Sequence, residues 1–518
     1  MVCWLEVLLI FAIIFIVGGA PPPHVNETYY LTKAKHYWEP QWCAGDPFLE
    51  SADAHLTFYW TIGWLAKWFS LPVVAWIGRI AAWMLLAVSW QRLSSRVLHR
   101  PLFGVLSCML MATLIEKTYL SGEWVFGGVE GKCFAYAFVF WGLAELAEGR
   151  WRRMWLWLGL AGAFHVLVGG WATIAAGFVW MTERRVQRAS LVSLLPTLFL
   201  GGVLALPGVI PALQLTRGVS AETAAEANQI YVFERLAHHL APLALPAQEL
   251  TKKGLRFSLV VVGLGGLWWL TRKREEEGAE GLNRLLRFAW GSLVLCLVGF
   301  SWELAAWNQP ALAAKLLKYY WFRLADVAVP LAMSLAVFWL ASGLMQRRPK
   351  LAGLFLLTTL AYPCWFMLSS SSARYQNPLP PADRKVTDHH DWQQACRWAR
   401  ENTPADALFL VPRGSQSFEW YAYRKGLVTW KDVPQDAASL ISWRDRYFDV
   451  FTRIDEQGHR THVSFAKQGD ERVGQLAEKY QAEYVITDEY PPLLLPRVYQ
   501  NKSFTIYATN LKAKSDSQ

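Results

Sequence analysis

The chain has 518 residues, of which 53% are hydrophobic, and it carries 29 Trp and a formal net charge of +10. Apolar runs long enough for the ~30 Å hydrocarbon core of a bilayer recur along most of its length, which excludes a soluble multidomain protein. Lys and Arg gather in the short connections between these runs, so we interpret the charge as a signal for membrane orientation and predict no nucleic-acid partner.

The predicted membrane part is a polytopic helix bundle. Its first segment, 4–20, could be a cleaved signal peptide, but it contains Glu6 and lacks the basic head of such peptides, so an uncleaved helix is expected. The apolar run at 56–69 is short for a span and is expected to form an interfacial, juxtamembrane helix. About eleven spans are predicted from length and hydropathy, at 4–20, 73–91, 102–115, 131–147, 154–167, 169–182, 189–212, 257–271, 288–305, 324–345 and 351–369.

The connections between these segments fall into two sets that differ severalfold in their density of Lys and Arg. The denser set comprises 91–101, 148–153, 183–188, 272–287 and 346–350. The positive-inside rule makes this set cytoplasmic, which places the N-terminus inside a multi-pass cell-membrane protein and the C-terminal domain outside. The alternation requires 154–182 to be a tight pair of short helices, with Gly169-Gly170 as the turn. The predicted external connections are 21–55, 116–130, 213–256 and 307–323.

Two domains follow from this pattern. Residues 1–369 are the transmembrane domain, which includes a first external loop with its juxtamembrane helix at 21–72, and residues 370–518 are an external soluble domain. A linker rich in Ser and Pro is expected at 369–381. The fold class is therefore mainly α, a membrane helix bundle with a C-terminal α/β domain. Within that domain the pattern predicts helices at 391–402 and 475–480 and strands at 407–411, 484–487 and 504–508.

Carboxylates and aromatic side chains alternate in the first external loop. Glu27, Asp46 and Asp53 are its candidate catalytic groups, because a carboxylate at a membrane surface can act as a general base or bind a metal ion. Glu27 is the first choice. The alternative is a solvated loop held together by Lys–Glu pairs.

Basic groups near the predicted helix mouths are candidates for binding a phosphate. Arg323 and Lys318 precede or open a late helix, and Arg donates two parallel hydrogen bonds to phosphate; the alternative is an interfacial aromatic–basic belt. Glu130 and Lys132 flank the start of the 131–147 helix between glycines, where they could line a pocket or anchor the helix by snorkelling.

Three further groups are expected at the same outer cavity. Arg79 and His165 lie inside predicted spans, and ionisable groups there are functional candidates, although Arg79 could snorkel and His165 could be a packing residue. His238 lies in the long third external loop, which has the length of a binding loop. A metal pair with the adjacent His239 is disfavoured, because neighbouring side chains on a helix point apart.

Several motifs together resemble the GT-C superfamily of integral membrane glycosyltransferases. The string Asn26-Glu27-Thr-Tyr-Tyr30 is similar to the acidic start of that superfamily's first external loop, although Asn26 stands where an Asp is frequent, so the identity of the catalytic carboxylate stays open. The remaining matches are the juxtamembrane run 56–69, Phe164-His165 with Gly169-Gly170, the basic element Tyr320-Trp-Phe-Arg323, and the tail from Trp392 to Ala407.

The resemblance implies hexosyl or pentosyl transfer from a polyprenyl-phosphate sugar in the lipid bilayer to an unknown acceptor at the outer face. Glu27 would deprotonate the acceptor, and Arg323 with Lys132 or Lys318 would stabilise the departing phosphate. A bound Mg²⁺ or Mn²⁺ could share that role, but no metal ligands are assigned. The alternatives are a transporter or flippase of an anionic or lipid-linked substrate, which would place polar groups at the bilayer midplane, and a non-catalytic scaffold.

Overall fold

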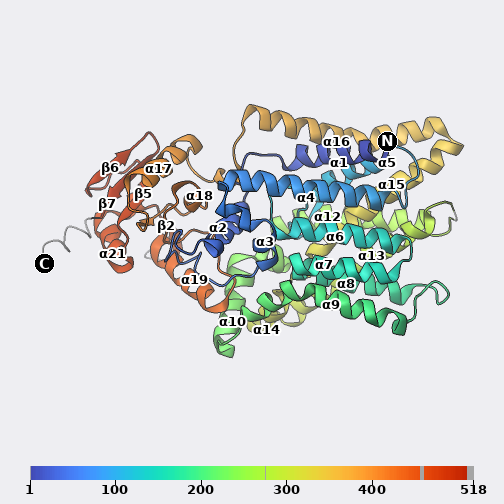
Figure 1. Cartoon of the computed structure of the whole chain (residues 1–518), viewed down its shortest axis with the longest axis horizontal. Helices are drawn as coiled ribbons and strands as arrows, with labels where there is room; N and C mark the ends of the chain where they lie inside the picture. Colours follow the sequence, from blue (N-terminus) through green and yellow to red (C-terminus); the bar gives the residue numbers. More distant parts are fainter. Residues whose placement is uncertain (1, 275, 455–459, 510–518) are drawn as a thin grey trace.

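The computed structural model describes residues 2–274, 276–454 and 460–509. Within this part, eleven helices coincide with the eleven apolar segments predicted from the sequence, and they run alongside one another as a bundle (Figure 1). Six are long and apolar enough to cross a membrane by length and composition: α4 (Leu71–Ser94), α9 (Leu191–Gln214), α12 (Ala247–Thr271), α13 (Ala279–Ala305), α15 (Arg323–Arg347) and α16 (Pro349–Gln376). The other five have 14–17 residues: α1 (Val2–Gly18), α5 (Phe103–Thr118), α6 (Gly131–Ala147), α7 (Trp151–Phe164) and α8 (Val166–Thr182).

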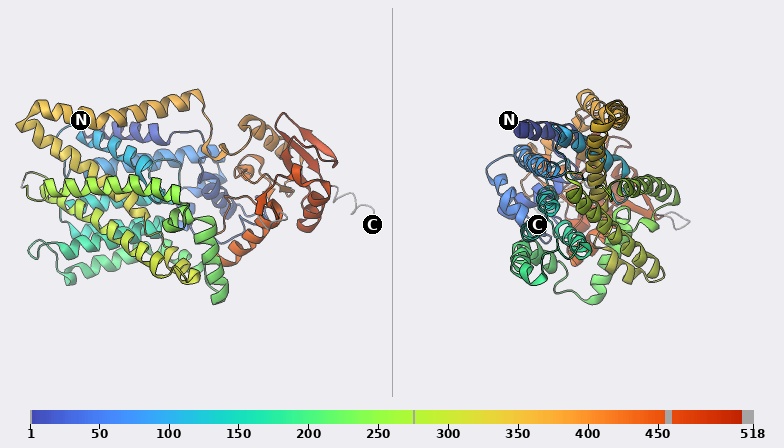
Figure 2. Two further views of the ribbon diagram at one scale, coloured as in Figure 1. Left: turned by 180° about the vertical axis from the view of Figure 1, so that it is seen from behind. Right: turned by 90° about the vertical axis from the view of Figure 1, so that its right-hand side faces the viewer.

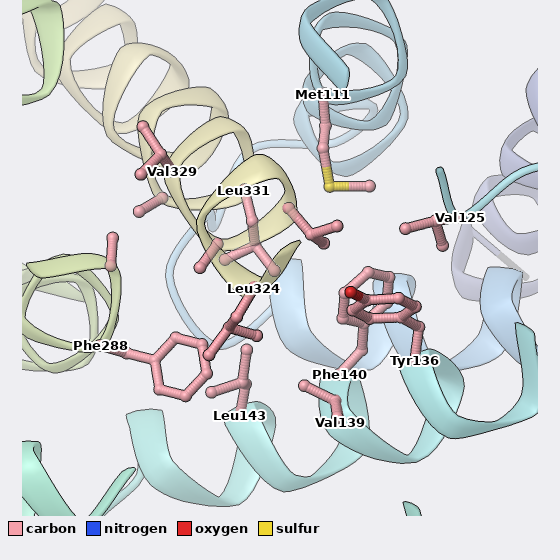
Figure 3. Close-up of a cluster of buried hydrophobic side chains, with 14 of the residues drawn as sticks. Met111, Val125, Tyr136, Val139, Phe140, Leu143, Phe288, Leu324, Val329 and Leu331 are labelled. Carbon is pink, nitrogen blue, oxygen red and sulfur yellow. The ribbon is translucent and has the colours of Figure 1, made fainter. Parts of the chain in front are cut away.

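Helix α15 lies at the centre of the bundle. Of its most apolar stretch 78% is buried, against 17% for α9, which therefore presents most of its apolar surface outward, as expected of a helix facing lipid. Figure 3 shows Leu324 of α15 among side chains of neighbouring helices, including Phe140 of α6 and Phe288 of α13. The central position of α15 matters for the site, because the helix begins at Arg323.

The short helix pair was predicted correctly as a pair, but its turn was placed wrongly. The break lies at His165, which has an extended backbone and separates α7 from α8. Gly169 lies inside α8 and packs against α7. A Cβ at this position would stand 2.3 Å from the backbone nitrogen of Gly162. Glycine is needed at this position for close helix approach and not for a turn.

Short helices occupy the connections at one end of the bundle. The predicted juxtamembrane run forms α3 (Leu56–Thr61) and the 3₁₀ turn η1 (Gly63–Lys67), and it is preceded by α2 (Glu27–Trp38). Helix α12 begins ten residues, nearly three turns, before the predicted apolar segment at 257–271, and a Glu249–Lys253 pair of 2.8 Å supports that first stretch. The remaining short elements are α10 (Ala221–Gln229), the π-helix η2 (Ile230–Arg235), α11 (Ala237–Leu240), η3 (Pro242–Ala244) and α14 (Pro310–Leu317).

The C-terminal domain is built on a mixed five-stranded sheet of order β2-β1-β5-β7-β6. Strands β1, β2 and β5 are parallel, whereas β7 pairs antiparallel with β5 and β6. The sheet lies beyond one end of the bundle (Figures 1 and 2), which confirms the predicted α/β tail. Its strands are β1 (Leu408–Leu410), β2 (Lys425–Gly426), β5 (Tyr484–Asp488), β6 (Arg497–Gln500) and β7 (Phe504–Ala508), and a separate hairpin joins β3 (Thr452–Ile454) and β4 (Arg460–His462).

Alternate residues of the central strands pack to opposite faces of this sheet. Phe409 and Ile486 face α17 (His389–Asn402), whereas Leu410 and Val485 face α19 (Ala437–Phe451) and α21 (Asp470–Tyr480). The second face also includes Ile230 at the start of η2, so the sheet domain and the third loop share one apolar core. The other short elements of this domain are η4 (Pro381–Asp383), α18 (Phe418–Ala422) and α20 (Phe465–Gln468).

Helix α16 runs farther than its hydropathy indicates. The predicted linker begins at 369, but the helix continues to Gln376. Arg374 donates hydrogen bonds to the carbonyl oxygens of Ile16 (2.6 Å) and Val17 (3.2 Å) at the end of α1. These hydrogen bonds hold the last turn of α16 against the end of α1, just before the chain enters the C-terminal domain.

Candidate functional site

A large cavity lies between the helix bundle and the C-terminal domain. Its volume is about 1490 Å³, whereas a pocket for one small molecule usually has ~300–1,000 Å³. All four connections predicted to be external contribute to its lining, and so does the C-terminal domain. One lining residue from each, in chain order, is Asn26, Glu123, His238, Lys318 and Lys431.

Four side chains of alternating charge form a row in the wall of this cavity, the charged row: Glu130, Lys132, Glu123 and Arg323. The Lys132 ammonium is 3.1 Å from Glu130 Oε1 and 3.6 Å from Glu123 Oε1. Arg323 Nε is 3.1 Å from Glu123 Oε2, and its guanidinium lies 3.6 Å from the centre of the Tyr320 ring. Both carboxylates are buried, so the cations beside them offset the cost of removing them from water.

Asp326, one turn into α15, holds the second loop against Arg323. Its carboxylate accepts hydrogen bonds from the backbone N–H groups of Leu120 (2.7 Å), Ser121 (2.9 Å) and Glu123 (3.1 Å). One buried carboxylate therefore fixes the turn that carries Glu123. Glu123 was not among the predicted site residues, because no local sequence pattern distinguishes it from other loop carboxylates.

Glu27 stands behind the cavity wall and does not line it. Its two carboxylate oxygens are each 2.6 Å from the Arg79 guanidinium, and they also accept from the N–H groups of His24 (2.7 Å) and Val129 (2.8 Å). Burial alone would raise the pKa of Glu27, but the charge and hydrogen bonds of Arg79 lower it below its ordinary value. The neighbouring Asn26 does reach the site, because its amide donates to Glu130 Oε2 over 2.9 Å.

His55 and His165 are two of the histidines that line the cavity. Their rings are 6.4 Å apart. His165 Nδ1 accepts a hydrogen bond from Val168 N (3.3 Å) and so caps α8, which leaves the proton of the neutral ring on Nε2. Burial and the charge of Lys33 lower the pKa of His55 to about 4, so that ring is neutral as well.

Asp46 and Asp53 do not line the cavity. Asp46 accepts from the N–H groups of Phe48 (2.9 Å) and Leu49 (3.0 Å), and across the domain junction from Gly426 N (3.1 Å). Asp53 lies 3.5 Å from the ammonium of the buried Lys33. Both carboxylates serve contacts that shape the first loop.

Of the remaining predicted site residues, some line the cavity and others do not. Lys318 and His238 line the cavity, whereas Arg79 is fully buried behind it with Glu27. Lys318 lies beside the Tyr319 ring, 5.3 Å from its centre. The structure thus brings together Glu130, Lys132, His165, His238, Lys318 and Arg323, and leaves Glu27, Arg79, Asp46 and Asp53 outside the cavity surface.

The carboxylates of the charged row do not fit a divalent cation as they are arranged. Lys132 places an ammonium between Glu123 and Glu130, where a metal ion shared by these two groups would have to stand. The carboxylate of Glu27 is likewise taken up by Arg79. Over the described residues, no group of three or more His, Cys, Asp and Glu side chains could hold a metal ion.

A family model described as a domain of unknown function (DUF6798) matches residues 390–450, within the C-terminal domain. No curated protein matches the chain. Among solved structures, the oligosaccharyltransferase of Archaeoglobus fulgidus in complex with Zn and sulfate is 13% identical with a TM-score of 0.49; the match covers 94% of this chain and 68% of that one. The same figures, with 69% of that chain covered, hold for archaeal AglB of this organism in complex with an inhibitory peptide and a dolichol-phosphate.

Proposed function

We propose that this protein is a membrane glycosyltransferase that moves a sugar from a polyprenyl-phosphate donor to an acceptor hydroxyl group in the cavity. The observation that carries the proposal is the charged row, which places two cations and two carboxylates of distant segments in one cavity with an apolar flank. Three of the motifs that resemble the GT-C superfamily contribute residues to the same cavity: Asn26 and Tyr30 of the first, Phe164 and His165 of the second, and Tyr320 and Arg323 of the third.

The donor would lie with its lipid chain along the apolar flank. This flank is formed by Ala163 and Leu167 at the α7–α8 break and by Val209 and Ala212 of α9, the helix that presents most of its surface outward. Its phosphate would then meet Arg323 and Lys132, with Lys318 nearby. As the bond from sugar C1 to the phosphate oxygen breaks, its electron pair passes to the phosphate, and these cations stabilise the added charge.

Glu130 is the group best placed to take the acceptor's proton. It lines the cavity, Asn26 holds its Oε2, and its Oε1 has one polar contact in the described part of the chain, the Lys132 ammonium at 3.1 Å. The acceptor oxygen would form its new bond to sugar C1 while its proton passes to Glu130. Glu27, our first choice from sequence, would instead act with Arg79 as the frame that holds Asn26 and the second loop in place.

The test is donor cleavage by the purified full-length protein in proteoliposomes, with labelled polyprenyl-phosphate hexose and pentose. We expect release of the sugar, and we expect Glu130→Gln to reduce it by roughly 10²-fold or more, the usual worth of a positioned base. Arg323→Gln should lower the rate similarly. Glu401→Gln, at an exposed position of α17, is the matched control and should leave the rate unchanged.

Two outcomes would contradict the proposal. Passage of intact label across the bilayer without cleavage would support a transporter. Cleavage that survives Glu130→Gln but disappears in a correctly folded Glu27→Gln variant would return the role of base to Glu27.

A further inference from the structure

Several cations that line the cavity have no carboxylate partner in the described part of the chain, and two of them, Arg235 and Lys431, belong to neighbouring segments that contact each other. Arg235, the last residue of η2, and Lys431, in the C-terminal domain, both line the cavity. In the described part of the chain neither forms an ion pair within 4.0 Å. By contrast, Lys132 and Arg323 of the charged row are paired with Glu123 and Glu130.

Arg235 and Lys431 are shielded from water and lie near each other, so leaving their positive charges unpaired costs free energy. Arg235 is only 8% exposed, its guanidinium lies 4.8 Å from the centre of the Trp430 ring, and its Nε donates to the Trp430 carbonyl oxygen over 3.1 Å. Burial and the charge of Arg235 lower the pKa of Lys431 to about 8. Asp432 is close enough to influence both, but its carboxylate already accepts from the Thr429 hydroxyl. Arg235 is buried and Lys431 is partly buried, and like charges in such surroundings are stabilised when an anion joins them.

This pair is separate from the donor's proposed phosphate site. Arg323 packs on the ring of Tyr320, whose hydroxyl is 2.7 Å from that of Tyr231 on η2. Tyr231 precedes Arg235 by four residues on η2, so the contact between the two tyrosines links the segments that carry Arg323 and Arg235. The cavity volume of about 1490 Å³ also leaves room for a second ligand beside the donor.

We propose that Arg235 and Lys431 form a subsite for an oxyanion, a carboxylate or phosphate group, carried by the acceptor. The planar guanidinium of Arg235 can donate two parallel hydrogen bonds to such a group, and the Lys431 ammonium supplies a second charge. Lys431 and the Trp430 support of Arg235 belong to the C-terminal domain, whereas the apolar flank that suits a lipid is formed by α7, α8 and α9. The assignment to the acceptor rests on the proposed function; the anion site itself does not.

The test is binding of inorganic phosphate to the full-length protein in nanodiscs at constant ionic strength, with and without saturating farnesyl phosphate as a short donor mimic. We expect phosphate binding to persist when farnesyl phosphate occupies the Arg323 site. Lys431→Gln should weaken this remaining binding on the order of tenfold, equivalent to ~1.4 kcal/mol. Over the described residues the Lys431 side chain forms no hydrogen bond or ion pair, and the exposed Lys467→Gln is the matched control.

Two outcomes would overturn the proposal, and a third would count against the proposed sugar transfer alone. Equal phosphate binding by Lys431→Gln and the unsubstituted protein would remove the anion site. Displacement of the remaining phosphate by farnesyl diphosphate, with an affinity that falls tenfold in Lys431→Gln, would assign the pair to a second phosphate of the donor. A failure of sugar transfer alone would show as absent donor cleavage with phosphate binding intact.

Discussion

At the scale of single residues, Glu27 and Arg79 show that a carboxylate can stabilise the segments around a cavity without lining the cavity itself. Both side chains are fully buried, and each Glu27 oxygen is 2.6 Å from the guanidinium. Arg79 also donates to the Ala20 carbonyl oxygen, so the pair joins α4 to the start of the first loop. Removing one member of such a pair leaves an uncompensated buried charge, which is far more destabilising than removing both.

Glu27→Gln is therefore expected to reduce the free energy of unfolding by ~3–5 kcal/mol, because it leaves the Arg79 charge unpaired. The measurement is thermal or denaturant unfolding of the detergent-solubilised protein. The double variant Glu27→Gln with Arg79→Met should recover part of the loss. A Glu27→Gln variant as stable as the original chain would show that the pair does not hold the fold.

At the scale of elements, three buried carboxylates meet where the first loop contacts the C-terminal domain: Asp46, Glu419 and Asp432. Burial raises the pKa of each, and the charges of Asp46 and Asp432 raise the pKa of Glu419 further. Nearby bonds tie the same junction, such as Ala52 N to Asp436 Oδ2 (3.1 Å). The contact between the first loop and the C-terminal domain thus includes groups whose charge depends on pH.

The sign of this dependence follows from Asp432, whose pKa is raised by burial to about 7 from its ordinary 3.8. The folded state binds this proton more tightly than the unfolded chain, so the contribution to stability is largest at low pH and declines as pH rises to about 7. Asp432→Asn should therefore raise the melting temperature at pH 8 and change it least near pH 4. The exposed Asp406→Asn is the control, and an offset that is the same at every pH would contradict the prediction.

Elements with a strong local signal were predictable, and elements stabilised by distant partners were not. The apolar spans and strand β7 were placed correctly, because hydropathy and alternation are local properties. Strand β6 was missed because it is a mostly exposed edge strand of polar composition that depends on pairing with β7. Helix α19 was also missed; its apolar face is completed by residues of the third loop and the sheet.

At the scale of the whole molecule, every connection predicted to be external lies at the end of the bundle that carries the C-terminal domain, where the cavity is lined by all of them. The connection between α8 and α9, which belongs to the predicted cytoplasmic set, is at the other end (Figure 1). The charge distribution and the fold are thus consistent with one orientation across the membrane.

The orientation can be tested with single cysteines in a chain whose exposed Cys3 and Cys364 are replaced by Ser. Val186, 99% exposed between α8 and α9, and Tyr490, 80% exposed in the C-terminal domain, are suitable positions. A membrane-impermeant maleimide should label Tyr490→Cys on intact cells and label Val186→Cys only after permeabilisation. The reverse pattern would place the cavity on the cytoplasmic side.

The sequence by itself determined the membrane class, the positions of the spans and the presence of a C-terminal α/β domain, because these follow from composition and local periodicity. It also identified several residues of the cavity, among them Glu130 and Arg323. Only the tertiary structure decided that Glu27 lies behind the wall, that Glu123 completes the charged row and that Lys431 enters from the C-terminal domain. Those facts depend on the rotation of short helices and on the docking of segments hundreds of residues apart, which no local pattern encodes.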